Sequence, residues 1–224
     1  VCDDVDAALR TRALEGASAL AWRSGLKHDC APVMELRRVG ARYVNGLGEE
    51  VDVEPARVYP LSKGSDLANG RAPRHRAVLV TQRALGDDTA SLRTEAPKTW
   101  AYLTAHRERL AARRSSIYRG RADFAMFGVG DYAFAPYKVA ICGLYKRLVF
   151  TVVEPLDGRP VMLDDTSYFL PCETRAQATR IAEALRSERA RAFFEARVSW
   201  DAKRPITRAL LQSLSLDALL REGP

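Results

Sequence analysis

Tyrosines alternate with basic residues in the central part of the chain. The alternation starts at Ser115-Ser116-Ile117-Tyr118-Arg119-Gly120-Arg121 and continues through Tyr132, Tyr137-Lys138 and Tyr145-Lys146-Arg147. Lys and Arg neutralise phosphates, Arg also makes bidentate contacts with guanine edges, and aromatic rings stack on bases. The pattern therefore predicts a DNA-binding surface. The same residue types also allow a second interpretation, in which the tyrosines are core residues and the basic side chains are solvated.

The positive charge of the chain is concentrated in this same central part. The 224-residue chain has a formal net charge of +7. Between residues 107 and 147 there are nine Lys and Arg residues against three acidic residues, a local balance of 9 − 3 = +6. Most of the excess positive charge is thus concentrated in one segment, as expected for a protein that binds a polyanion.

Two acidic pairs offer a different chemistry. Asp87-Asp88 and Asp164-Asp165 could hold a divalent metal ion for phosphodiester cleavage. Adjacent residues on a strand point to opposite faces, however, so a pair alone rarely shares one ion. A nuclease that uses Asp164 and Asp165 would need further acids from elsewhere in the fold. Turn and capping roles are the simpler expectation, and no metal site is predicted.

Two further motifs carry little catalytic signal. Ser24 near His28-Asp29 suggests a hydrolase triad, but no nucleophile-elbow glycine pattern surrounds the serine. The segment Phe127-Gly128-Val129-Gly130-Asp131 superficially resembles a cofactor-binding glycine turn. Such a turn requires a helix directly after it, which the following aromatics and Pro136 oppose. We expect a structural histidine, a tight turn, no catalytic residue and no cofactor site in this chain.

Composition indicates a reduced, non-membrane protein. The four cysteines are isolated, without a Cys-x-x-Cys pair, so thiols are expected rather than a disulfide framework or zinc site. Apolar runs such as residues 139–144 are far shorter than the roughly 20 residues that cross a bilayer, and no signal-peptide pattern opens the chain. A cytoplasmic location follows. The start at Val1, directly in a charged stretch expected to be helical from Asp3 to Leu20, indicates a fragment of a longer protein.

Short strands are expected in the first hundred residues. Residues 33–36, 41–44, 51–53 and 77–80 have strand composition, and Asn45-Gly46 predicts a hairpin turn between the second and third of them. Residues 62–73 are expected to form a loop. Pro97 precedes an amphipathic helix predicted over 98–114, with Trp100, Leu103 and Leu110 on one face.

The second half predicts strands followed by helices. Runs at 124–127, 138–144, 148–153 and 161–163 suggest an antiparallel meander. Thr174 and Gln177 form a capping box that starts a helix continuing to Phe193-Phe194. A shorter helix follows Pro205, and the apolar stretch from Leu214 to Leu220 is expected to pack back on the body. The predicted class is mixed α/β (α+β): a β-rich lobe at 1–97, then a connecting helix and an antiparallel lobe with flanking helices at 98–224.

Linked motifs in this order resemble the C-terminal region of TaqI-type adenine-specific DNA methyltransferases and fused restriction-modification enzymes. The motifs, which cover about residues 20 to 210, are Trp22-Arg-Ser-Gly-Leu-Lys-His28-Asp29, Val58-Tyr59-Pro60-Leu61-Ser62-Lys63-Gly64-Ser65-Asp66, Trp100-Ala-Tyr-Leu103 with Arg113, Phe127-Gly-Val-Gly-Asp-Tyr132-Ala-Phe134-Ala-Pro-Tyr137-Lys138, and Lys203-Arg-Pro-Ile-Thr207.

The resemblance implies a target-recognition domain that grips duplex DNA opposite an N-terminal methyltransferase domain and helps to hold a flipped adenine, because N6 is inaccessible inside the base stack. The family's catalytic Asn-Pro-Pro-aromatic motif is absent, since no two prolines are adjacent. S-adenosyl-L-methionine is therefore expected in the catalytic domain of the parent protein, and the chain alone is expected to be catalytically silent.

The resulting hypothesis is site-specific binding of double-stranded DNA. A divalent-metal nuclease, or an interaction module that docks residues 210–220 on another domain, remain alternatives. The resemblance implies DNA contacts for Lys63 and Lys138, and charge and position suggest the others. The predicted DNA-binding residues are Lys27, His28, Lys63, Arg113, Arg114, Tyr118, Arg119, Arg121, Tyr132, Tyr137, Lys138, Lys146 and Arg147.

Overall fold

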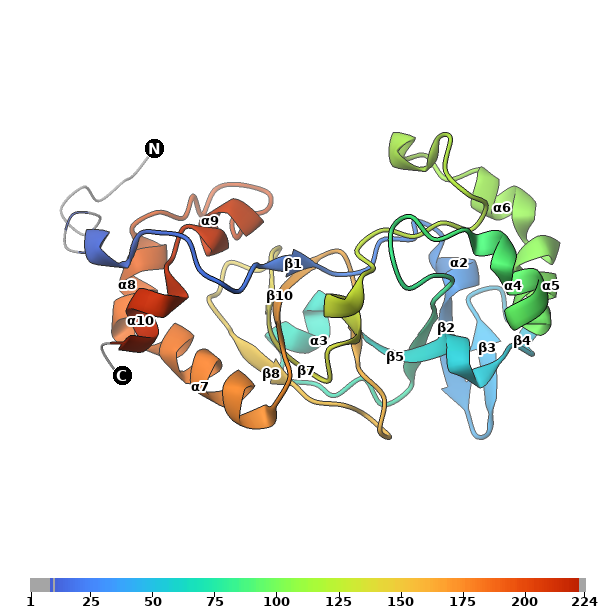
Figure 1. The fold of residues 1–224 in the computed structure, drawn as a ribbon, viewed down its shortest axis with the longest axis horizontal. Helices are drawn as coiled ribbons and strands as arrows, with labels where there is room; N and C mark the ends of the chain where they lie inside the picture. Colours follow the sequence, from blue (N-terminus) through green and yellow to red (C-terminus); the bar gives the residue numbers. More distant parts are fainter. Residues whose placement is uncertain (1–8, 10, 222–224) are drawn as a thin grey trace.

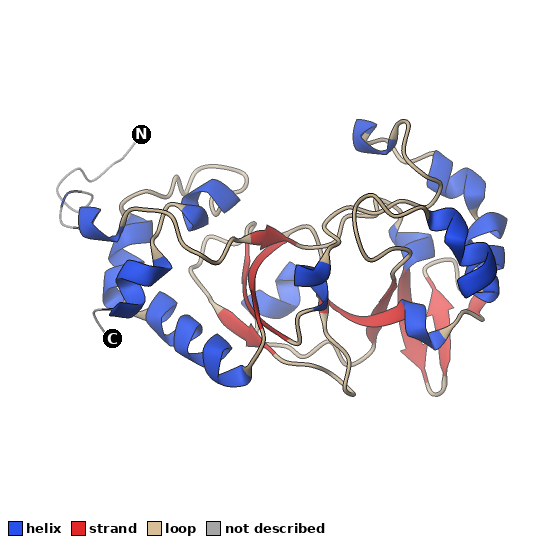
Figure 2. Ribbon diagram, viewed as in Figure 1, coloured by secondary structure: helices blue, strands red, loops and turns tan. Residues whose placement is uncertain are grey.

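The computed structural model describes residue 9 and residues 11–221. Within them the smaller of two β-sheets lies near the middle of an elongated molecule, the larger sheet extends from there toward one end, and helices gather at both ends (Figure 2). The class is therefore α+β, as the sequence predicted. No helix in this part of the chain combines the length and the apolar character needed to cross a bilayer.

The larger sheet has six strands and is almost wholly antiparallel. The exception is the last pair, in which β9 runs parallel to β5 and comes from a distant part of the chain. In spatial order the strands are β4 (Glu50–Val51), β3 (Arg42–Asn45), β2 (Glu35–Val39), β6 (Arg76–Leu79), β5 (Val58–Ser62) and β9 (Met162–Leu163).

The smaller sheet has four strands, all antiparallel to their neighbours. Its edge strand β1 belongs to the beginning of the chain, whereas the others come from the second half. In spatial order the strands are β1 (Arg23–Ser24), β10 (Ser167–Cys172), β7 (Tyr137–Cys142) and β8 (Thr151–Val153).

The helices form two groups at opposite ends of the molecule, with α3 between them (Figure 1). The first half contains α2 (Ala31–Met34), α3 (Gly64–Ala68), α4 (Leu92–Glu95), α5 (Pro97–Ala105) and α6 (Arg107–Ala111), and the second contains α7 (Arg175–Arg186), α8 (Glu188–Glu195), α9 (Arg208–Gln212) and α10 (Leu216–Arg221). Single 3-10 turns are η1 (Arg12–Leu14), η2 (Pro55–Arg57), η3 (Thr89–Ser91), η4 (Ser116–Tyr118) and η5 (Asp131–Phe134).

The sheets and helices pack around two large hydrophobic clusters. One lies between the six-stranded sheet and helices α2, α4, α5 and α6, and it includes Leu36, Val78 and Leu103. The other lies between the four-stranded sheet and α7 to α10, and it includes Phe150 and Phe194. Leu14 and Trp22, from the beginning of the chain, pack in this second cluster, so the early residues contribute to the core at the far end of the molecule.

Several predicted elements are confirmed. β3 and β4 form the hairpin that turns after Asn45, and Pro97 is the first residue of α5. The side chain of Thr174 accepts a hydrogen bond from the backbone N–H of Gln177 at the start of α7, as the capping box predicted. The terminal apolar stretch packs on the body, because Leu214, Leu216 and Leu219 are buried in the second cluster.

Other predicted elements are wrong in type or extent. Residues 31–34 form the short helix α2, and the strand begins only at Glu35. The predicted loop at 62–73 contains helix α3, and residues 124–127 form no strand beyond one isolated bridge. The predicted meander is incomplete because β9 pairs with β5 of the other sheet.

The long helices of the prediction are also interrupted. The helix expected over 98–114 breaks at His106 into α5 and α6. The one after Thr174 breaks at Ser187, whose hydroxyl accepts from the N–H of Ala190 and so starts α8. Of the helix predicted from Asp3 to Leu20, residues 3–8 and 10 lie outside the described residues, and 11–20 contain only the turn η1.

Candidate nucleic-acid interface

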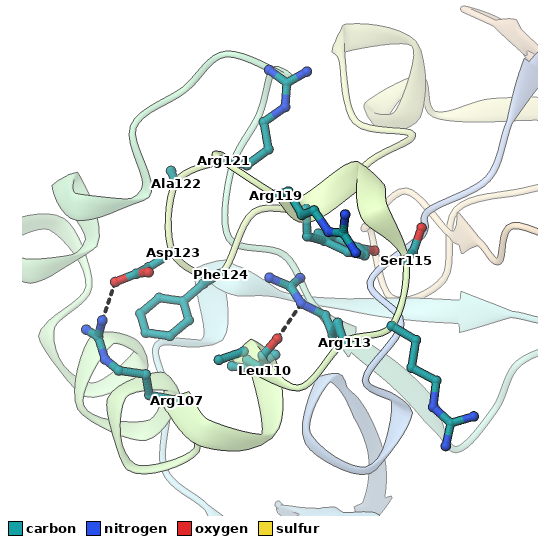
Figure 3. A pocket seen from close by; sticks show the side chains of 12 residues that line it. Arg107, Leu110, Arg113, Ser115, Arg119, Arg121, Ala122, Asp123 and Phe124 are labelled. Carbon is teal, nitrogen blue, oxygen red and sulfur yellow. Dashed lines mark hydrogen bonds and ion pairs between the residues drawn. The ribbon is translucent and has the colours of Figure 1, made fainter.

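An arginine-lined hollow follows helix α6. It has a volume of about 270 Å³, and Figure 3 shows the side chains around it. Five guanidinium groups and the ring of Tyr118 contribute to its walls. The arginines are Arg107, Arg113, Arg114, Arg119 and Arg121.

Arg113 fixes the base of this hollow. Its Nε donates to the carbonyl of Leu110 at 2.7 Å, and its Nη1 donates to the carbonyl of Ala125 at 2.7 Å. The same Nη1 lies 3.5 Å from the carbonyl of His28, which connects the hollow to the beginning of the chain. Because its N–H groups donate to backbone carbonyls, the guanidinium group of Arg113 is held in place. It still contributes positive charge to the wall of the hollow.

Tyr118 lies against this support. The guanidinium carbon of Arg113 is 3.8 Å from the centre of the Tyr118 ring, and the ring of Phe127 packs edge-on at 5.3 Å. The tyrosine hydroxyl is enclosed and has no hydrogen-bond partner among the described residues. Burial raises the pKa of Tyr118, which keeps the hydroxyl protonated. The enclosed hydroxyl does not reach the solvent, so only the rest of the half-buried Tyr118 side chain can face the hollow.

The outer arginines of the hollow carry uncompensated charge. Arg107 is paired with Asp123, as Figure 3 shows. In contrast, Arg114, Arg119 and Arg121 are exposed and have no carboxylate partner in the part of the chain that the structure describes. Exposed, unpaired guanidinium groups are the groups that release counterions when they meet a phosphate backbone.

A second group of charged side chains lies beside the hollow, where the two sheets meet. Lys27 Nζ is 2.7 Å from Asp29 Oδ1 and 3.5 Å from Asp165 Oδ2. The hydrogen bond that Lys27 donates to Asp29 is the main reason that the pKa of Lys27 is raised, so this ammonium stays charged. Arg204 Nη2 donates to the backbone carbonyl of Asp165 at 3.4 Å. The turn at residues 164–166 thus brings together cations from distant parts of the chain.

Lys63 and His28 are held by a shared carboxylate. Lys63 Nζ lies 2.7 Å from Glu35 Oε2, and His28 Nε2 lies 3.7 Å from Glu35 Oε1. His28 is buried, and its Nδ1 accepts a hydrogen bond from the N–H of Cys30. Burial lowers the pKa of His28, which favours the neutral ring. Lys63 is half-buried and can reach solvent, whereas His28 has a structural role.

Glycines allow the segments at this junction to approach closely. The backbone of residues 25–27 bridges both Asp164 and Phe127. A side chain at Gly25 would clash with the carbonyl of Asp164, and one at Gly128 would clash with the carbonyl of Gly25. Gly128 also has a φ of +73°, which favours glycine. The glycine-rich sequence at 127–131 is therefore explained by packing and by the turn before η5.

Lys138 lies in the core, contrary to its predicted contact with DNA. Its side chain is only 1% exposed, and Nζ donates to the carbonyl of Ala135 at 2.7 Å. Burial lowers the pKa of Lys138 to about 7. The strand β7 that carries it is covered on both faces, and the sequence motif gave no sign of this. We therefore remove Lys138, together with the buried His28, from the set of candidate DNA contacts.

The two predicted tyrosines that follow the hollow are half-buried. Tyr132 packs near Phe169, and its hydroxyl donates to the carbonyl of Val129 at 3.0 Å. Tyr137 packs against the second hydrophobic cluster. For these two rings the structure gives the core environment that the second interpretation of the sequence allowed. Lys146 and Arg147, by contrast, are exposed in the loop between β7 and β8.

Asp164 and Asp165, the two carboxylates of the nuclease alternative, make contacts with protein groups. Asp164 Oδ1 accepts hydrogen bonds from the N–H of Gly64 and from the hydroxyls of Thr166 and Ser167. Asp165 faces Lys27, as described above. No group of three or more potential metal ligands occurs among the described residues. The arrangement of Asp164 is typical of a turn that positions its neighbours.

Two cations of this surface, Arg107 and Arg204, were not among the DNA-binding residues predicted from the sequence. Arg107 lies at the hollow, but the predicted helical face gave no reason to choose it over other arginines. Arg204 reaches the 164–166 turn from a segment about forty residues later, and its guanidinium also lies 3.4 Å from the hydroxyl of Tyr168. Its place in the motif at 203–207 was the only available signal.

Comparison with known proteins provides one informative match. No protein-family model matches the chain. The type II methyltransferase M.NspV from Nostoc sp. is 45% identical over 205 residues, which cover 91% of this chain and 43% of that protein. The chain is similar to part of a type II methyltransferase. It spans less than half the length of that relative.

A solved structure is more distantly similar. The type IIL restriction-modification enzyme MmeI, in complex with DNA, superimposes with a TM-score of 0.46 at 12% identity, covering 79% of this chain and 22% of that chain. This likeness is too remote to bear on function.

Proposed function

We propose that this chain is the DNA target-recognition region of a restriction-modification methyltransferase, and that it binds duplex DNA through the arginine hollow and the adjoining junction. The observation that carries the proposal is the convergence of Arg113, Arg114, Arg119 and Arg121 around one hollow. The similarity to a type II methyltransferase over most of the chain supports it.

The proposed DNA surface extends from the hollow to the junction. Arg113 connects the two because it donates to the carbonyl of His28, next to Lys27. Arg114, Arg119 and Arg121 would bind phosphates, and the ring of Tyr118 would support the wall of the hollow by packing on Arg113. Lys27 and Lys63 are already paired with carboxylates, so they would contribute less to affinity.

The finer role follows from the TaqI-type resemblance. We propose that the two lobes, residues 1–97 and 98–224, act as one unit that faces an N-terminal methyltransferase domain of the same protein. That domain would bind S-adenosyl-L-methionine and transfer the methyl group to adenine N6, while this chain holds the duplex around the flipped base. Such a protein would act on DNA in the cytoplasm.

The direct test is fluorescence anisotropy with random-sequence duplex DNA over a series of salt concentrations. The variant Arg119→Ala/Arg121→Ala removes two unpaired cations, and Arg42→Ala/Arg175→Ala is the matched control because it removes the same charge elsewhere. If both arginines contact phosphates, the first variant lowers the salt dependence, log K against log salt, by about 2. The control leaves it nearly unchanged.

The outcomes separate the possible roles. Equal effects of the two variants would mean that only net charge matters and that the hollow is not the interface. Absence of binding by the wild-type chain at low salt would contradict the proposal that this region binds DNA by itself.

A further inference from the structure

The loop between β7 and β8 exposes two adjacent apolar side chains. Leu144 is 42% exposed and Tyr145 is 39% exposed. Apolar side chains that are exposed next to each other can contribute to a contact with a partner. The loop follows β7, in which every residue after Tyr137 is buried.

The base of this loop is fixed by packing. Gly143 donates its N–H to the carbonyl of Thr166 at 2.8 Å, and a side chain at this position would clash with Tyr168 and with the backbone of Ile206. On the other side Phe150 is buried between the rings of Trp22 and Phe194. The tip is thus presented on a rigid support, and ordering it on binding would cost little conformational entropy.

Two cations follow the apolar pair directly. Lys146 and Arg147 are exposed, and neither has a carboxylate partner among the residues that the structure describes. An apolar tip beside unpaired positive charge suits a surface that offers both phosphates and apolar base surfaces. Nucleic acid combines these two features, because apolar side chains contact or wedge beside bases while Lys and Arg bind the flanking phosphates.

The loop also adjoins the proposed DNA surface. Its first residue, Gly143, is hydrogen-bonded to Thr166, the neighbour of Asp165. Asp165 in turn contacts Lys27 and Arg204 at the junction. The turn at 164–166 therefore supports both the junction cations and the β7–β8 loop, which lies on the four-stranded sheet while the arginine hollow follows α6.

We propose that the β7–β8 loop is a second DNA contact, in which Leu144 and Tyr145 touch bases and Lys146 and Arg147 bind the adjacent phosphates. This inference rests on the proposed function. The duplex would then be held at two separated points, the arginine hollow and this loop.

The test compares exposed apolar residues in two places on the 224-residue chain. Leu144→Ser/Tyr145→Ser removes the apolar tip without changing the charge. Leu85→Ser/Val39→Ser is the matched control, because these side chains are 49% and 45% exposed and lie outside the proposed DNA surface. Binding to random-sequence duplex DNA is measured over a salt series, and thermal unfolding verifies that each variant folds.

We expect the Leu144/Tyr145 variant to bind roughly tenfold more weakly at every salt concentration, since one stacked or buried base contact contributes about that much. Its salt dependence should equal that of the wild type, because no cation is lost. In Lys146→Ala/Arg147→Ala the salt dependence should fall by about 2.

Three results would overturn the inference. If the Leu144/Tyr145 variant binds like the control while Arg119→Ala/Arg121→Ala weakens binding, the hollow binds DNA and the loop serves another surface, such as another domain. If Lys146→Ala/Arg147→Ala leaves the salt dependence unchanged, the phosphate contacts are refuted. If the wild type does not bind duplex DNA, the loop proposal fails together with the proposed function.

Discussion

Replacing Lys138 by Met should stabilise the protein at neutral pH. The lysine is enclosed in the core, where Nζ has one hydrogen bond, to Ala135, and lies 5.8 Å from the centre of the Phe169 ring. Burial lowers its pKa from 10.5 to about 7. Met has a similar length and no charge, so it fills the same space without the cost of burying an ammonium.

The magnitude follows from the two pKa values. Between pH 7 and pH 10.5 the unfolded chain binds a proton that the folded chain releases, so the free energy of unfolding rises with pH by about 1.4 kcal/mol per unit. Near pH 7 the penalty for Lys138 is about 4 kcal/mol, and at pH 9 it falls to about 2 kcal/mol. Loss of the hydrogen bond to Ala135 subtracts about 1 kcal/mol from the gain in the Met variant.

Urea unfolding of both proteins at pH 7 and pH 9 measures this difference. The advantage of Lys138→Met should be about 3 kcal/mol at pH 7 and should shrink by about 2 kcal/mol at pH 9. DNA affinity should not change, since the side chain does not reach the surface. A Met variant that is less stable at both pH values, or whose advantage does not depend on pH, would refute the reasoning.

Other predictions concern the turn, the hollow and a helix start. Gly128→Ala should destabilise the fold by more than about 2 kcal/mol in thermal unfolding, whereas Gly158→Ala, with a similar φ but open space, should cost about 1 kcal/mol. Tyr118→Phe should raise stability by about 1 kcal/mol in urea, because it removes an enclosed, unpaired hydroxyl; a loss would reveal a hidden partner. Although burial opposes ionisation, hydrogen bonds from Thr99 lower the pKa of Glu54 to about 2. Glu54→Gln should therefore cost about 1 kcal/mol at pH 7 and little near pH 2, as followed by circular dichroism.

Local signals in the sequence identified the elements that local chemistry determines. The Asn45-Gly46 turn, Pro97 at the start of α5 and the Thr174 cap were predictable because the residues that specify each feature lie within a few positions of it. The pairing of β9 with β5 was not, since it joins residues about one hundred positions apart. Two-residue strands carry no periodicity from which a partner could be inferred.

The sequence predicted which segment carries the candidate site, but not which individual residues contribute to it. Charge and spacing indicated Arg113 to Arg121, where several side chains do gather. Tyrosine and lysine alternate in the same way at Tyr137-Lys138, but there the strand is buried. Long amphipathic side chains occur in both settings, and only the covering of β7 by other elements distinguishes a core lysine from a surface one.

The interleaving of the two sheets limits how this architecture can be recombined. Strand β9 pairs with β5 across the middle of the molecule, β1 pairs with β10, and residues 25–27 bridge segments from the second half. A chimera that exchanges residues 98–224 with a relative would have to match partners in 20–66 at these contacts. If the chain recognises DNA as proposed, changes in its specificity would therefore be easier to acquire through surface loops, such as the η4 segment and the β7–β8 loop, than through exchange of halves.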